Sequence, residues 1–143
     1  MSTERFTAIV LAADRNAHDP ILEASGACCK AMVKIDGVPM LERVVRALLD
    51  SAQVDHIVIS GHRNKQLAGS VFLAEALDNG SINWTTPEDS PSNSAYRAMR
   101  ALPENVPVLV TTADHPLLRA DIVDDFVTRS VASGADVGVG LTD

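Results

Sequence analysis

Short, near-continuous apolar runs recur along the chain. Such runs are typical of strands that are buried on both faces of a sheet. We therefore predict strands at the segments with this pattern, which are residues 6–12, 56–60, 82–86, 106–111 and 135–141. A shorter strand is predicted within residues 31–37, where Asp36 and Gly37 form a turn that ends it.

Between the strands, apolar residues recur at the spacing of one helix face. This spacing predicts helices at residues 39–49, within 64–77, at 90–102 and at 120–133. Pro39 suits a first helical turn, and the serines that open the third helix can cap its free N–H groups. The last helix is expected to end at Gly134 and to carry on one face Ile122, Val123, Phe126, Val127 and Val131.

Residues 13–29 are predicted to form a long loop, because Asp19-Pro20 and Ser25-Gly26 are turn signals. The alternation of strands and helices around it predicts an α/β fold. Its order favours a three-layer, doubly wound and mostly parallel sheet with helices on both faces. The 143 residues suit one domain, 1–143, and whether that domain is truncated at its C-terminal side stays open.

Composition narrows the fold and the partners. Aromatic residues make up only 3% of the chain, so the core must consist of Val, Leu, Ile and Ala, which suits a sheet covered by helices. The net charge of −7 argues against binding to nucleic acid or to an anionic membrane surface. A small anionic ligand that is held by a few local donors or a metal stays compatible with that charge.

The cysteines and the N-terminus indicate the compartment. Cys28 and Cys29 are adjacent, which suits neither a mutual disulfide nor a zinc site, and we interpret them as reduced thiols. The N-terminus lacks the pattern of a signal peptide, and no apolar run nears the roughly 18 residues of a membrane span. We therefore expect a cytoplasmic protein.

Candidate chemistry follows the strand ends. Ligands of open parallel sheets bind beyond the carboxyl ends of the strands. Three features are expected to meet there: the loop after residues 6–12, Lys30 at the end of that loop, and Asp114 just past the strand at 106–111. Asp114 can also be an ordinary turn residue, and Lys30 an ordinary solvated lysine.

An ordered set of short motifs resembles the MobA-like nucleotidyltransferases. The set consists of Leu11-Ala12-Ala13, then Lys30, then Gly37-Val38-Pro39-Met40-Leu41, then Asp114-His115-Pro116-Leu117-Leu118. Each motif alone is weak, but together they fall in the order typical of that family and span most of the chain. The resemblance implies the Rossmann-like, GT-A-like fold that this family shares with nucleotide-sugar pyrophosphorylases and GT-A glycosyltransferases.

The resemblance also implies a reaction. In this family a phosphorylated acceptor attacks the α-phosphorus of a nucleoside triphosphate, and pyrophosphate leaves. Charge on the phosphate oxygens must be neutralised, and a divalent metal such as Mg²⁺ or Mn²⁺ does much of this. Asp114 is then the expected metal ligand, and Lys30 is expected to contact phosphate oxygens as a compact point charge. We interpret both as catalytic residues.

Further nucleotide contacts are implied by the same resemblance. Leu11, Ala12 and Ala13 would offer backbone groups to the base and the ribose, and their small side chains allow close approach. Ser92 and Ser94, at a helix start, either contact the base or ribose or simply cap the helix.

Two departures from the family pattern keep alternatives open. Asp14 stands where the family's phosphate loop has a glycine, so Arg15 and the Ser25-Gly26 pair are candidates to replace that loop. The family's second metal-binding Asp lies farther along the fold than Asp143. A non-enzymatic nucleotide-binding or regulatory domain of the same fold therefore stays an alternative, as does an unrelated flavodoxin-like or receiver-like module. The sequence names neither the base, the acceptor nor the oligomeric state.

Overall fold

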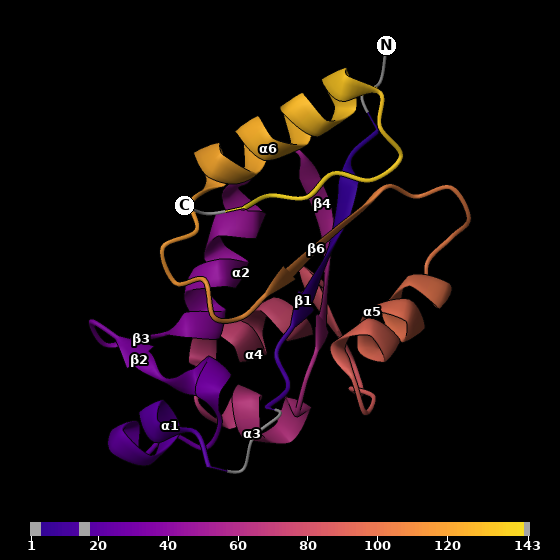
Figure 1. The fold of residues 1–143 in the computed structure, drawn as a ribbon. Coiled ribbons are helices and arrows are strands. Elements are labelled where there is room, and N and C mark those ends of the chain that lie inside the picture. The colour runs from indigo at the N-terminus through magenta and orange to yellow at the C-terminus, as the bar shows by residue number, and fades with distance from the viewer. Residues whose placement is uncertain (1–3, 15–17, 142–143) are drawn as a thin grey trace.

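The main sheet of the protein is parallel. The structure is a computed structural model and describes residues 4–14 and 18–141. Within these residues, four strands form the sheet in the order β5-β4-β1-β6 (Figure 1). Every neighbouring pair runs parallel. The strands are β1 (Phe6–Leu11), β4 (Val54–Ser60), β5 (Ile82–Thr85) and β6 (Val108–Thr112).

Alternate residues of the strands enter two separate parts of the core. Ala8 and Val10 of β1 belong to the larger hydrophobic cluster, whereas Ile9 belongs to a smaller one on the opposite face. The fully buried Ile57 and the nearly buried Val58 of β4 divide between the clusters in the same way. Burial on both faces explains why these strands appear in the sequence as continuous apolar runs.

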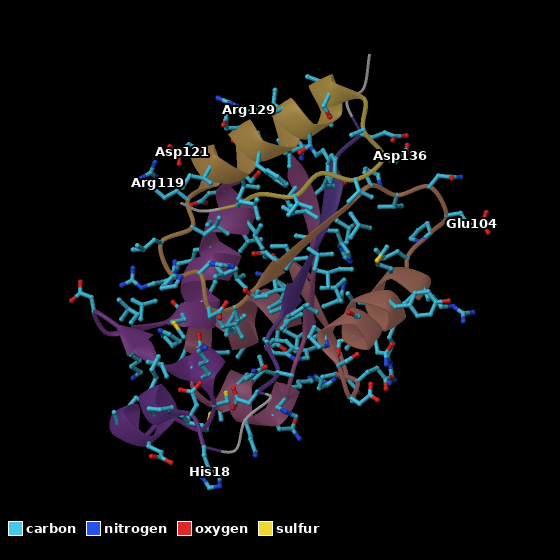
Figure 2. All side chains as sticks on the ribbon, in the orientation of Figure 1. His18, Glu104, Arg119, Asp121, Arg129 and Asp136 are labelled. Atoms are coloured by element: carbon cyan, nitrogen blue, oxygen red, sulfur yellow. The ribbon has the colours of Figure 1, made fainter. Side chains whose placement is uncertain are left out.

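Helices cover both faces of the sheet. The larger cluster lies under α2 (Met40–Asp50), α4 (Val71–Asp78) and α6 (Ala120–Ser133), and α5 (Pro91–Arg100) covers the other face (Figure 1). The α/β class, the mostly parallel sheet and the helices on both faces are therefore confirmed. Charged side chains on α6, such as Arg119 at its N-cap, Asp121 and Arg129, point away from the sheet (Figure 2).

Smaller elements gather at the end of the sheet where β1 finishes (Figure 1). They are α1 (Pro20–Ser25), the 3₁₀ turn η1 (Lys30–Met32), α3 (Arg63–Ala68) and the antiparallel hairpin of β2 (Lys34–Ile35) and β3 (Val38–Pro39). The predicted loop 13–29 thus contains a helix. Asp19 accepts the N–H of Ile21, and Pro20 occupies the first helical position, so this dipeptide starts a helix instead of a turn.

Two further predictions differ from the structure. The helix predicted within 64–77 is divided into α3 and α4, because Ser70 takes an extended conformation and caps α4 by accepting the N–H of Leu73. On α6, Val123 and Val127 are buried, whereas Ile122 and Val131 are exposed. The apolar face of that helix is therefore narrower than its sequence spacing suggests.

The predicted strand at 135–141 is not formed. These residues are exposed and run back alongside α6 (Figure 1), where a Cβ added at Gly140 would lie 3.3 Å from the Phe126 ring. Val139 and Leu141 remain 75% and 88% exposed. An apolar alternation can form a strand only when it finds a pairing partner, and this segment has none among the described residues. None of the described helices has the length and apolar character that a membrane crossing requires.

Candidate functional site

A cavity of about 600 Å³ opens at the carboxyl ends of three parallel strands. The register places Leu11 beside both Ser60 and Thr112, so β1, β4 and β6 end at the same level. The beginning of α5 and the turn that contains Lys30 form the side walls. The cavity is lined by Leu11, Ala12, Ala13, Asp14, Asp19, Lys30, Ala31, Ser60, Glu88, Asp89, Ser90, Pro91, Ser94, Thr112, Ala113 and Asp114.

Lys30 and Asp114 form an ion pair in the lining of this cavity. The Nζ atom of Lys30 lies 3.6 Å from Oδ2 of Asp114 and 3.9 Å from Oδ2 of Asp19. The Lys30 and Asp114 side chains are 37% and 46% exposed, so both can reach a ligand. The structure thus brings together two residues that are 84 positions apart in the sequence. Their proximity cannot be read from the sequence, because it arises from parallel strands that end at the same edge of the sheet.

Asp114 is held as an anion by its own strand end. The Thr112 hydroxyl donates to Oδ1 of Asp114. This hydrogen bond lowers the pKa of the Asp114 carboxyl below its ordinary value, and the nearby His115 and Lys30 lower it further, although partial burial opposes them. A carboxylate that accepts one hydrogen bond and remains half exposed keeps oxygen lone pairs available for a cation.

Asp14 anchors the Lys30 turn. Its Oδ1 accepts the backbone N–H of Lys30 at 2.9 Å, which fixes the start of η1 against the end of β1. The residue that replaces the family's glycine therefore has a structural partner. Its carboxylate also lines the cavity, where it would repel a phosphate. Arg15, the predicted replacement for a phosphate-binding arginine, lies outside the described residues.

The end of β1 supplies the predicted floor of the site. Leu11, Ala12 and Ala13 all line the cavity. The Ala12 backbone is bonded on both sides, since its N–H donates to the Ser60 carbonyl at 2.8 Å and its carbonyl accepts from Nε2 of Gln66 at 2.8 Å. The small side chains of Ala12 and Ala13 leave room for a flat group to lie against the backbone.

The predicted serines have different fates. Ser94 lines the cavity, but it is buried, and its Oγ accepts the N–H of Glu88 at 2.8 Å, so it holds the loop before α5. Ser92 is exposed and lies outside the lining, and the N-cap of α5 is Ser90. The predicted Ser25 and Gly26, at the end of α1, are exposed and also lie outside the lining.

Several lining residues were not predicted from the sequence. Ser60 and Thr112 are the last residues of their strands, and the strand-end rule that selected Asp114 would have selected them too. Asp19 was interpreted only as a turn residue. Glu88 and Asp89 carry no motif, and only the fold places them against the cavity.

The described lining is strongly acidic. It holds the carboxylates of Asp14, Asp19, Glu88, Asp89 and Asp114, and Lys30 is its one basic side chain among the described residues. No group of three or more His, Cys, Asp or Glu in the described ranges is arranged to hold a metal ion without further ligands. An anionic ligand would therefore need an additional cation to enter this cavity.

The fold is shared with several solved structures. One neighbour is 4-diphosphocytidyl-2C-methyl-D-erythritol synthase from Anaerococcus prevotii, with a TM-score of 0.64 and 15% identity over 89% of this chain and 51% of that one. A second is a CMP:2-keto-3-deoxy-manno-octonic acid synthetase complexed with CTP, with a TM-score of 0.60 and 16% identity over 91% and 49%. A third is Rv0371c from Mycobacterium tuberculosis, with a TM-score of 0.65 and 16% identity over 92% and 62%.

The family is shown by a match of the sequence itself, whereas the solved structures show the fold alone. The chain spans between about half and three fifths of the length of these solved structures. No curated protein matches the sequence closely enough to count as a relative. The sequence itself matches the description of the MobA-like NTP transferase domain over residues 8–142, which is nearly the whole chain. With the parallel sheet and the cavity at its carboxyl end, this match establishes that the chain belongs to the MobA-like NTP transferase domain family.

Proposed function

We propose that this domain transfers a nucleotide from a nucleoside triphosphate to a phosphorylated acceptor, with release of pyrophosphate and with dependence on Mg²⁺ or Mn²⁺. The observation that carries the proposal is the 3.6 Å approach of the Lys30 ammonium to the Asp114 carboxylate in the strand-end cavity. Family membership supports the use of a nucleoside triphosphate. An acceptor oxygen forms a bond to the α-phosphorus, the bond to the β-phosphate breaks, and pyrophosphate carries the charge away.

Each residue has a role in this proposal. The ammonium of Lys30 holds non-bridging phosphate oxygens, which neutralises part of the charge that builds up as pyrophosphate leaves. The backbone from Leu11 to Ala13 receives the base and the ribose. Asp114 binds the divalent cation that accompanies the triphosphate. When the Lys30 ammonium moves from Asp114 to the phosphates, it stays next to a negative charge. The Asp114 carboxylate then has the divalent cation as its positive partner.

The residues present fit a metal that arrives with its nucleotide. Mg²⁺ is commonly bound by one or two carboxylates together with substrate phosphates and water. The Asp114 carboxylate is ionised and half exposed, which meets that requirement, while the described lining offers no closed metal cage. When bound, such a cation orients and polarises the phosphates. The acidic lining also favours a metal-bound nucleotide over a free one.

CTP is the first nucleotide to test. One structural neighbour is named as a complex with CTP, and another is named for a diphosphocytidyl product. Isothermal titration calorimetry with CTP, GTP, ATP and UTP, each with and without Mg²⁺, would rank the bases. A pyrophosphate-release assay over sugar phosphates and phosphorylated alcohols would then identify the acceptor class.

Variants at the two central residues give the decisive comparison. We expect Lys30→Met and Asp114→Asn each to weaken Mg²⁺-nucleotide binding at least tenfold, about 1.4 kcal/mol. Lys34→Met and Asp121→Asn remove the same charges from exposed positions outside the cavity, and we expect them to bind like the wild type. Binding by Asp114→Asn that is unchanged and still Mg²⁺-dependent would remove the proposed role of Asp114.

A second candidate function is nucleotide binding without turnover. It is favoured by one observation, namely that the Asp14 carboxylate holds the Lys30 turn in the place where the family has a glycine-rich phosphate loop. Such a domain would bind Mg²⁺-nucleotide in calorimetry but would release no pyrophosphate with any acceptor. Turnover with one acceptor would exclude this function.

A further inference from the structure

Gln66 of α3 is a fully buried polar side chain that is bonded to the cavity floor but does not line the cavity itself. Its exposed fraction is 0%. Nε2 donates to the carbonyl of Ala12 at 2.8 Å and lies 3.8 Å from the sulfur of Cys29. Ala12 is part of the predicted nucleoside contact, and Cys29 directly precedes Lys30. One amide therefore touches both segments that carry the proposed nucleotide contacts.

The other end of the amide is enclosed by a third segment. Oε1 of Gln66 points at Gly61, the residue that follows β4, and finds no hydrogen-bond donor in the described part of the chain. A Cβ added at Gly61 would overlap Oε1 and lie 3.2 Å from Cδ. Gly61 is itself held by the backbone of β5, because its N–H donates to the carbonyl of Thr85 at 3.2 Å. The amide of Gln66 thus fills a slot that only a glycine leaves open.

Two hydrogen bonds to side chains connect Gln66, the end of β1 and the Lys30 turn. The first is the hydrogen bond from Gln66 to the Ala12 carbonyl, and the second is the hydrogen bond from the Lys30 N–H to Asp14. Only Ala13 lies between Ala12 and Asp14 along the chain, and Cys29 is directly followed by Lys30. A shift of the Gln66 amide therefore moves the end of β1 relative to the Lys30 turn.

We propose that Gln66 is a positioning residue for the nucleotide: its amide, seated against Gly61, sets the distance between the Ala12–Ala13 backbone and the Lys30 ammonium. This inference rests on the proposed function. A nucleoside triphosphate must touch the floor and the ammonium together, and small errors in such a geometry are costly. A neutral amide suits the role, because a charged donor in this buried place would have to be desolvated.

The test compares two variants that disturb the amide from opposite sides. Gln66→Met keeps the volume but removes the donor, and Gly61→Ala pushes the amide out of its slot. We expect each to weaken Mg²⁺-nucleotide binding about tenfold, with KM for the acceptor unchanged. Because both act through one amide, the double variant is expected to bind no worse than the weaker single variant, whereas independent effects would multiply.

Stability is controlled with Val127→Ala, which changes a buried position of α6 that does not line the cavity. Measured at a temperature where all variants are folded, it is expected to lower the melting temperature and to leave nucleotide affinity at the wild-type value. Gln66→Glu adds a pH readout. Its neutral acid can donate to the Ala12 carbonyl and its carboxylate cannot, so its affinity relative to the wild type is expected to recover as the pH falls.

The outcomes separate the inference from the proposed function. Wild-type binding together with unchanged affinity in Gln66→Met would overturn the inference alone. Multiplying losses in the double variant, or an affinity loss in Val127→Ala as large as that in Gln66→Met, would reduce Gln66 to a structural residue and also overturn it. Failure of the wild type to bind any nucleotide with Mg²⁺ would remove the proposed function, and the inference with it.

Discussion

At the scale of single residues, the hydroxyl of Thr112 contributes most to the lowered pKa of the Asp114 carboxyl. Its hydrogen bond favours the carboxylate over the neutral acid, and the electrostatic effects of His115 and Lys30 on Asp114 add to that preference. Folding thus lowers the pKa of the Asp114 carboxyl. A depressed carboxyl pKa stabilises the folded state at pH values above the unfolded pKa, and this contribution is lost as the pH falls through the folded pKa.

The first prediction concerns this hydrogen bond. We expect Thr112→Val to raise the pKa of Asp114 toward its ordinary value, because the donor that favours the anion is removed. The pKa can be measured by following the carboxyl carbon of Asp114 by NMR as the pH changes. The free energy of unfolding of the variant should fall below that of the wild type near neutral pH, and the difference should shrink as the medium becomes acidic.

Thr111→Val is the matched control for this titration. Thr111 precedes Thr112 on the same strand, and it has no hydrogen bond to Asp114 among those described. An equal rise of the Asp114 pKa in both variants would show that strand packing, and not the hydroxyl of Thr112, sets the charge state.

Residues of the candidate site could be predicted from the sequence only where a motif or the end of a predicted strand marked them. Lys30 and Asp114 were selected by motif order and by the rule that ligands bind at carboxyl strand ends. Asp19 was missed as a cavity residue because its local signal is that of a turn, although it in fact caps α1. Gln66 was missed because a buried amide in a helix has no sequence signature, and its role depends on three segments that meet only in space.

At the scale of elements, Ser70 links two helices. Its Oγ accepts the N–H of Leu73, which caps α4, and donates to Oε2 of the buried Glu42 on α2 at 2.8 Å. The second prediction is that Ser70→Ala lowers the free energy of unfolding by about 1–3 kcal/mol, since it removes a helix cap and leaves a buried carboxylate oxygen without that donor. Urea unfolding followed by circular dichroism measures the change.

Ser81→Ala is the control for Ser70. The Ser81 hydroxyl bonds only to the side chain of the neighbouring Asn79 in an exposed turn, so the loss should be within about 0.5 kcal/mol. Equal losses in the two variants would mean that the contact between Ser70 and Glu42 adds nothing to stability.

The third prediction compares two neighbouring aspartates on α6. Asp124 accepts from the Ser51 hydroxyl at 2.5 Å and from the Ala52 N–H at 3.1 Å, which ties α6 to the end of α2. Asp125 forms an exposed i,i+4 ion pair with Arg129. We expect Asp124→Ala to cost about 1–3 kcal/mol of unfolding free energy. Asp125→Ala should cost no more than about 0.5 kcal/mol.

Chemical denaturation of both variants in one buffer checks this comparison, and added salt sharpens it. Salt should reduce the small effect of Asp125→Ala, because exposed pairs are screened, and should leave that of Asp124→Ala nearly unchanged. A larger loss for Asp125→Ala would reverse our view of how α6 is fastened.

Element types were well predicted, and element limits were set by contacts that the sequence does not display. Apolar runs in the sequence identified β1, β4, β5 and β6. The run is most continuous in β1, which is buried on both faces of the sheet. The division between α3 and α4 depends on Ser70 and its partner on another helix. The segment 135–141 has the alternation of a strand, but pairing decides strands, and among the described residues no strand lies beside it.

At the scale of the whole molecule, ligand binding should appear as global stability. A ligand that binds only the folded state raises the free energy of unfolding, by about 2.7 kcal/mol at a concentration one hundred times Kd. The fourth prediction is that Mg²⁺ and the preferred nucleotide together raise the melting temperature, whereas either alone has a smaller effect. The reason is that the acidic lining repels a triphosphate without a bound cation.

Differential scanning fluorimetry measures this synergy, and Asp114→Asn is expected to abolish it. Ca²⁺ and NaCl at equal ionic strength serve as controls for general screening. A nucleotide that raises the melting temperature of the wild type equally well in the presence of a chelator would contradict the metal-dependent arrangement.

The strand order of the sheet places the Ala12–Ala13 segment after a central strand and Asp114 after an edge strand. β1, which leads into the Ala12–Ala13 floor, is paired on both sides, whereas β6, which carries Asp114 at its tip, pairs among the described residues with β1 alone. Border strands open more readily than central ones. Amide protons of β6 should therefore exchange with solvent sooner than those of β1. The Asp114 carboxylate would then move more than the Ala12–Ala13 backbone, on which the base is proposed to lie.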